Sequence, residues 1–84
     1  MKKMIKGEKM KEIKQFFEKI GRSDIDETMD NLVEDGIIDS MEIMSLMQEI
    51  ETHYGVFIDF DYITPENLRN FQSISAMIES IKNQ

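Results

Sequence analysis

Residues 31–54 read NLVEDGIIDSMEIMSLMQEIETHY, and this stretch decides the fold. It runs from a loop, past Gly36, into a long amphipathic helical pattern that opens at Asp39-Ser40. The first turn of a helix leaves backbone N–H groups without partners and carries a partial positive charge. A phosphate ester on Ser40 would find hydrogen-bond donors and a favourable field there. The stretch therefore places one hydroxyl at the start of a helix, behind a glycine that permits a tight turn.

The same residues also fit an ordinary helix cap. Asp and Ser are both favoured N-cap residues. Asp39 and Glu42, three residues apart, resemble a capping box. On residues 39–42 alone, a cap explains the pattern more often than a modified serine does, so the surrounding residues have to decide between the two.

Residues 31–54 resemble acyl carrier proteins and are also similar to peptidyl and D-alanyl carrier proteins. The likeness extends over roughly residues 30–81 and more loosely over the first helix. Its main residues are Leu32, Glu34, Gly36, Ile37, Ile38, Asp39, Ser40, Met41 and the acidic helix that ends at Tyr54-Gly55. In that family the motif serine carries 4′-phosphopantetheine, whose thiol bears acyl or aminoacyl cargo as a thioester. The resemblance implies that this serine is Ser40 and that Asp39 is its flanking motif residue.

The resemblance also implies a fold and a set of partners. It implies an all-α fold, a small four-helix bundle of acyl-carrier type with a long loop between helices one and two and a short third helix. It implies a carrier, not an enzyme, that receives its arm from coenzyme A through a phosphopantetheinyl transferase. Met41, Glu42 and Ser45 depart from the family's common residues. These departures leave the cargo open among fatty acyl, polyketide, aminoacyl and D-alanyl groups, and with it a role in fatty acid, polyketide or nonribosomal peptide biosynthesis.

Apolar spacing predicts where the helices lie. The first is expected over about residues 8–20, with an earlier start left open, and a long loop follows over about 21–39. The second is expected over about residues 40–54. Thr64-Pro65 predicts the start of a short third helix, and a fourth is expected from near Gln72 to about Ile81.

Residues 56–60 are apolar enough for a strand, but no second strand is available to pair with them. We therefore expect an extended connector there.

The second helix divides into two faces at about 100° per residue. The face expected in the core carries Ile43, Leu46, Met47, Ile50 and Tyr54. We expect Leu46 and Ile50 to pack against Phe16, Phe17 and Ile78. The outward face, expected to bind partners, carries Met41, Glu42, Met44, Ser45 and Gln48. Methionines suit an adaptable docking surface, although Met44 could instead pack under a neighbouring loop.

The length and composition fit a small carrier. A chain of 84 residues is expected to form one domain over 1–84, with the first few residues as a disordered tail. It has no cysteine, so any thiol chemistry must come from a prosthetic group. No apolar run is long enough to span a membrane, and charged side chains interrupt any signal-peptide pattern at the start. We expect a cytoplasmic monomer without membrane insertion.

The net charge of −7 is unevenly distributed. Residues 1–22 hold eight basic and three acidic side chains, a net charge of +5. Residues 23–84 hold two basic and fourteen acidic side chains, a net charge of −12. The acidic part would repel nucleic acid and attract loading and processing enzymes that have basic docking patches. A solvated surface that serves only solubility is the alternative.

Other functions have weaker support in the sequence. A hydrolase that uses Ser40 would need a base within hydrogen-bond reach. His53, the only histidine, lies about 20 Å away along a continuous helix. Two acidic clusters, 24–30 and 59–61, lack the spacing of an EF-hand loop, so we expect no metal site. A non-modified acidic helical interaction module remains the alternative to the carrier.

Overall fold

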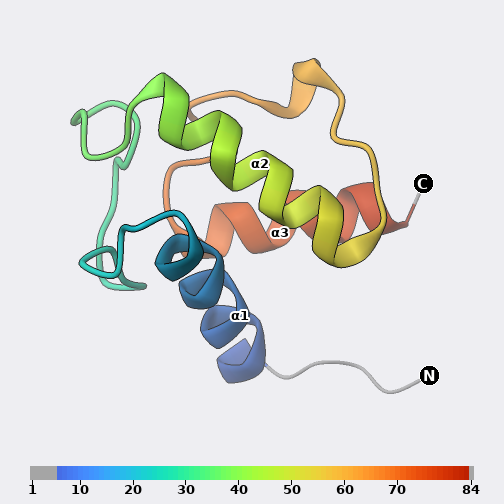
Figure 1. Ribbon diagram of the computed structural model, residues 1–84, viewed down its shortest axis with the longest axis horizontal. Coiled ribbons are helices and arrows are strands. Elements are labelled where there is room, and N and C mark those ends of the chain that lie inside the picture. The colour runs from blue at the N-terminus through green and yellow to red at the C-terminus, as the bar shows by residue number, and fades with distance from the viewer. Residues whose placement is uncertain (1–5, 84) are drawn as a thin grey trace.

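The computed structural model describes residues 6–83, which form an all-α domain (Figure 1). Its helices are α1 (Lys6–Lys19), α2 (Ser40–Tyr54) and α3 (Phe71–Lys82), and a 3-10 helix, η1 (Phe60–Tyr62), precedes α3. The described part of the chain contains no strand, in agreement with the expected connector after α2. The predicted N-terminal tail lies outside the described residues.

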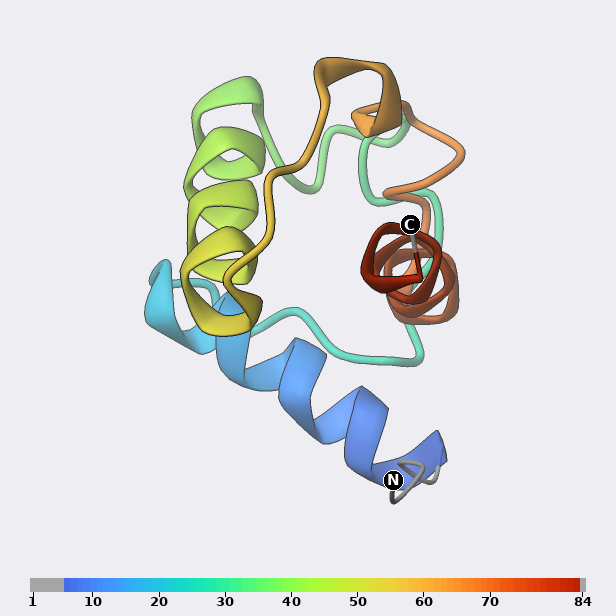
Figure 2. The same ribbon diagram turned by 90° about the vertical axis from the view of Figure 1, so that its right-hand side faces the viewer.

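The three α-helices surround one core. α1 packs against both α2 and α3. In Figure 2, α3 is seen nearly end-on and faces α2 across the molecule, with the long loop and the connector running between them. The core is closed by apolar side chains from these non-helical segments, namely Ile25, Leu32, Ile38, Ile58 and Leu68.

The predicted packing of Leu46 and Ile50 in the core is confirmed. Leu46 and Ile50 of α2 are fully buried in one cluster, and the other predicted members of this cluster are Phe16, Phe17 and Ile78. Phe17 also stacks on Phe71, with ring centroids 5.3 Å apart. Of the other predicted core residues of α2, Met47 is buried and Ile43 and Tyr54 are partly buried. The 3.6-residue periodicity thus identifies the inward face of α2 correctly.

The long loop before α2 is held by buried apolar side chains and backbone hydrogen bonds. Leu32 and Ile38 are buried, and the Ile38 N–H donates to the Leu32 carbonyl at 3.0 Å. The Leu32 N–H donates in turn to the Arg69 carbonyl at 3.0 Å, which joins this loop to the start of α3. Lys14 of α1 donates to the Ile25 carbonyl at 2.7 Å. The loop is therefore a fixed part of the domain.

The predicted four-helix bundle with a short third helix is not confirmed, because residues 6–83 form three α-helices. Thr64-Pro65 starts a turn in which the Leu68 N–H donates to the Thr64 carbonyl at 3.1 Å, and no helix follows. Asn70 already caps α3, since its side chain accepts a hydrogen bond from the Ser73 N–H. Too few residues lie between Pro65 and Asn70 to repay the cost of nucleating a helix.

Within residues 6–83, no helix combines the length and the apolar character that a bilayer crossing demands.

Candidate functional site

The start of α2 is closed by a complete capping box. The Asp39 carboxylate accepts a hydrogen bond from the Glu42 N–H at 2.8 Å. The Glu42 carboxylate accepts one from the Asp39 N–H at 3.0 Å. These reciprocal bonds satisfy backbone donors that the first turn would otherwise leave unpaired. The predicted cap is confirmed, and the capping is done by Asp39, which leaves the adjacent Ser40 hydroxyl out of the box.

Ser40 is the first residue of α2, and it is exposed. The chain reaches it through a tight turn in which the Gly36 N–H donates to the Val33 carbonyl at 3.0 Å. Gly36 has a φ of 69°, a left-handed conformation that disfavours residues with a Cβ. The Ser40 side chain therefore lies at the positive end of the helix dipole and is open to solvent.

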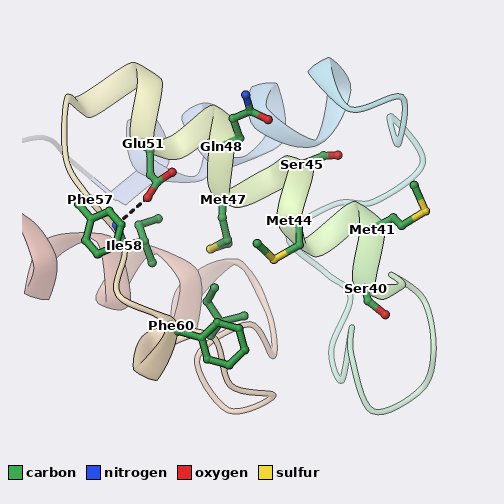
Figure 3. Close-up of a pocket in the computed structure, with 11 residues that line it drawn as sticks. Ser40, Met41, Met44, Ser45, Met47, Gln48, Glu51, Phe57, Ile58 and Phe60 are labelled. Atoms are coloured by element: carbon green, nitrogen blue, oxygen red, sulfur yellow. Dashed lines mark hydrogen bonds between the residues drawn. The ribbon is translucent and has the colours of Figure 1, made fainter.

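An apolar groove of about 820 Å³ runs from Ser40 along α2 (Figure 3). In Figure 3, Met44 and Met47 point from α2 toward Phe60, whereas Ser45 and Gln48 point away from it. The groove is lined by Ser40, Met41, Met44, Ser45, Met47, Gln48, Glu51, Phe57, Ile58, Phe60 and Ile63. Most of these side chains are apolar, so the groove fits an apolar ligand better than a polar one.

The wall of the groove opposite α2 is the connector 56–63, and α2 holds it in place. The Ile58 N–H donates to the Glu51 carboxylate of α2 at 2.8 Å, and the Ile58 side chain is buried (Figure 3). On either side of this anchor, Phe57 and Phe60 are 78% and 75% exposed. The connector thus buries one apolar side chain and leaves two aromatic rings at the surface beside α2.

The predicted partner-binding residues fall into two groups. Met41, Met44, Ser45 and Gln48 are exposed and line the groove, as expected of an outward face. Glu42 is different, because its carboxylate already has partners within the chain. It binds the Asp39 N–H and accepts from Arg22 Nη1 at 2.8 and 2.9 Å.

Arg22 is a residue of this site that sequence reasoning missed. Its Nη1 also donates to the Ile37 carbonyl at 2.7 Å. Hydrogen bonds to the Asp24 and Glu42 carboxylates raise the pKa of Arg22 above its ordinary value. The only signal in the sequence was an arginine directly after the glycine that ends the first helix. Nothing local pointed to a contact with a residue 20 positions away.

Phe57 and Phe60 were also missed as site residues, although a signal for them existed. Val56, Phe57, Ile58 and Phe60 crowd one short connector, and an extended chain points successive side chains to opposite sides. Some of these apolar groups had to face away from the core. Exposed aromatic rings could therefore have been predicted there, but not that they would lie beside the outward face of α2.

The remaining candidate groups of the sequence, His53 and the acidic clusters, have partners elsewhere in the described residues. His53 lies near the far end of α2, where its ring packs edge-on against Phe16 and its Nε2 is 3.7 Å from the Glu12 carboxylate. Among residues 6–83, no three acidic or histidine side chains converge as a metal site. Asp26 in the first acidic cluster accepts hydrogen bonds from Thr28, which lower the pKa of Asp26.

Comparisons with protein-family models, with curated proteins and with solved structures found no match to this chain.

Proposed function

We propose that this chain is a carrier protein that holds acyl or aminoacyl intermediates as thioesters on a 4′-phosphopantetheine arm attached to Ser40. The observation that carries the proposal is an exposed hydroxyl at the first residue of α2 that opens directly onto an apolar groove of about 820 Å³. The likeness of residues 31–54 to acyl carrier proteins supports the same function. An architecture of acyl-carrier type, in which residues 60–70 stand in for a short third helix, is part of this proposal.

The surroundings of Ser40 fit such an arm. A phosphate ester at the first residue of a helix lies in the favourable end of the helix dipole. Asp39 and Glu42, the nearest acids in the sequence, are hydrogen-bonded within the capping box. The arm supplies a thiol that forms thioesters, a group that a chain without cysteine lacks.

The chain's own part in attachment is to present a nucleophile. Transfer from coenzyme A forms a bond from Ser40 Oγ to phosphorus and breaks the phosphoanhydride bond of coenzyme A, which releases the nucleotide half. The hydroxyl proton has to leave for a base. The only histidine, His53, is about 20 Å from Ser40 along α2. In this proposal the base belongs to the transferase, and the chain is its substrate.

The groove favours apolar cargo. Its walls include Met44, Met47, Ile58 and Phe60, and the lining includes one charged side chain, Glu51, which is hydrogen-bonded to the connector. An acyl chain gains about 0.8 kcal/mol for each methylene buried against such walls, whereas the ammonium of an aminoacyl group loses hydration there. Within the carrier class, the proposal therefore ranks fatty acyl or polyketide cargo before aminoacyl or D-alanyl cargo.

A non-modified interaction module is the second candidate. The exposure of Phe57 and Phe60 favours it, because exposed aromatic rings beside an apolar groove are typical of protein-binding surfaces. In this reading Ser40 is only the residue after a helix cap, and the groove takes an apolar segment of another protein.

Intact mass after incubation with a phosphopantetheinyl transferase and coenzyme A separates the two candidates. The wild type should gain the mass of one phosphopantetheine, and Ser40→Ala should gain none. Ser45→Ala is the matched control, because Ser45 is also exposed and lines the same groove. It should gain the same final mass as the wild type, because the final mass reports where the arm is attached and not how fast the transferase binds.

Ser40→Ala should remain folded by circular dichroism, because Asp39 and not Ser40 makes the cap. A mass gain that persists in Ser40→Ala would contradict the assignment of the site. A wild type that gains no mass would favour the interaction module.

A further inference from the structure

The backbone of Arg22 is fixed to the end of α1. The chain turns after Lys19 at Gly21, whose φ is 83°. The Gly21 N–H donates to the Glu18 carbonyl at 3.1 Å, and the Arg22 N–H donates to the Phe17 carbonyl at 2.9 Å. These two bonds form a Schellman motif, which satisfies carbonyls in the last turn of a helix. The side chain of Arg22 therefore extends from a well-defined point just beyond the end of α1.

From that point the guanidinium joins α1 to the start of α2. Beyond its bonds to Ile37 and Glu42, its Nε and Nη2 donate to the two Asp24 carboxylate oxygens at 3.0 and 3.1 Å. All three nitrogens are thus engaged. Because the guanidinium is planar, three sets of acceptors fix its position and orientation.

The contacts of Arg22 lie on both sides of Ser40. Before Ser40, Arg22 binds the Ile37 carbonyl, and after it, the Glu42 carboxylate. The same Glu42 carboxylate holds the Asp39 N–H, so the residue directly before Ser40 is held through Glu42. Residues 37–42 are therefore held at three points. Arg22 binds the Ile37 carbonyl and the Glu42 carboxylate, and Glu42 in turn binds the Asp39 N–H.

We propose that Arg22 is a positioning residue for Ser40, which holds residues 37–42 against α1 so that the hydroxyl meets the transferase in one orientation. This inference rests on the proposed carrier function. Holding a reacting group in place can account for a large part of a rate, and small displacements are costly. Arg22 makes its hydrogen bonds near Ser40 to Ile37 and Glu42, so it acts on the hydroxyl through these two residues.

A second arginine in the chain provides a matched control. Arg69 also makes a two-pronged contact with a carboxylate, Asp30, but this contact lies at the start of α3. The side chains of Arg69 and Asp30 are 54% and 46% exposed, against 23% and 26% for Arg22 and Glu42. Losing Arg69 should therefore remove a similar kind of contact without loosening the chain around Ser40.

The first test measures order at the start of α2 without any modification reaction. Hydrogen exchange of the Glu42 and Ile43 amides, which donate to Asp39, reports how often this turn opens. In Arg22→Gln these amides should exchange roughly tenfold faster than in the wild type, since a hydrogen bond to a charged group is lost. Arg69→Gln should leave their exchange unchanged.

The second test measures modification by the transferase. In Arg22→Gln, kcat should fall roughly tenfold while KM for the carrier changes little, because orientation is lost and the exposed face of α2 is intact. Arg69→Gln should match the wild type in both constants. Arg22→Lys, which keeps one charged donor but not the fork, should fall between Arg22→Gln and the wild type.

Glu42→Gln gives an independent check if Arg22→Gln folds poorly. Glutamine can still complete the capping box but carries no charge for Arg22. The Glu42→Gln variant should lose kcat in the same way but to a smaller extent. In the double variant, Arg22→Gln should lower kcat by a smaller factor than it does in the wild-type background. Equal kcat in Arg22→Gln and Arg69→Gln, both folded, would overturn the proposal. A different result would be faster exchange in Arg22→Gln together with a wild type that is never modified. It would show that Arg22 orders residues 37–42, but it would refute both a role of Arg22 in modification and the proposed carrier function.

Discussion

Asp30 accepts hydrogen bonds from Arg69 Nε at 2.9 Å and Arg69 Nη2 at 3.0 Å. Asn70 adds a third bond to the same carboxylate at 3.1 Å. Arg69 is the largest cause, followed by the backbone N–H of Asn31 and then Asn70, and because these donors favour the charged form they lower the pKa of Asp30 from 3.8 to about 2. One carboxylate thus joins the long loop to the start of α3, and its charge depends on pH.

This shift predicts a specific acid sensitivity. A lowered pKa in the folded state gives stability that is complete above the unfolded value, near 3.8, and is lost as the pH falls toward about 2. Asp30→Asn should therefore lose less stability than the wild type between about pH 5 and about pH 2. The measurement is the urea midpoint at both pH values. The effect should be small, since the pair is exposed.

Arg69→Gln is the companion variant, because it removes the main donor and should reduce the acid sensitivity in the same way. Some sensitivity should remain in both variants, since Arg22 lowers the pKa of Asp24 and Thr28 lowers that of Asp26. If Asp30→Asn keeps the full acid sensitivity of the wild type, the Asp30–Arg69 contact does not persist in solution.

At the scale of the element, the two faces of α2 predict opposite responses to truncation. Leu46 is fully buried, whereas Met44, two residues earlier, is exposed in the groove. Leu46→Ala should lower the free energy of unfolding by about 2–5 kcal/mol, because it removes contacts and leaves a cavity. Met44→Ala should change it by only about 0.5 kcal/mol. Urea unfolding of both variants measures the contrast, and equal losses would mean that the face assignment is rotated.

The second helix, α2, which sequence reasoning located correctly, has strong local signals at both ends. For α2 these are the capping pair Asp39 and Glu42 at the start and Gly55, with a φ of 64°, at the end. The 3-10 helix and the missing third helix show the limit of local signals. Asp59 caps η1 through the Asp61 N–H, and Thr64-Pro65 looks like an equally good start. Asn70 caps α3 five residues after Pro65, and the residues between them form turns and no helix.

The candidate site was only partly predictable for a related reason. Ser40, Met41 and Met44 could be placed because they belong to one periodic helix. The opposite wall of the groove could not, since Phe57 and Phe60 lie on a connector whose path depends on the burial of Ile58. A helical period says which side of α2 faces outward, but not which segment of the chain lies next to it.

At the scale of the whole molecule, the net charge of −7 and the apolar groove should act on different steps of binding. Exposed charges mainly raise the association rate, and salt screens them over about 10 Å at 0.1 M ionic strength. Apolar contacts act more on dissociation and depend less on salt. Because Glu42 is bound to Arg22, reversing the charge of Glu42 would also break its contact with Arg22. Asp35, an exposed acid in the loop before Ser40, is the cleaner probe of charge.

We therefore predict that Asp35→Lys, which makes the net charge less negative by two units, slows modification by the transferase at low ionic strength and approaches the wild-type rate at high ionic strength. Met41→Ala, next to Ser40 and 81% exposed, should slow modification at both ionic strengths. The measurement is the initial rate of pantetheinylation for the wild type and both variants, with circular dichroism as the folding control. If both folded variants match the wild type at low ionic strength, the transferase does not recognise this end of α2, and its docking surface lies elsewhere on the domain.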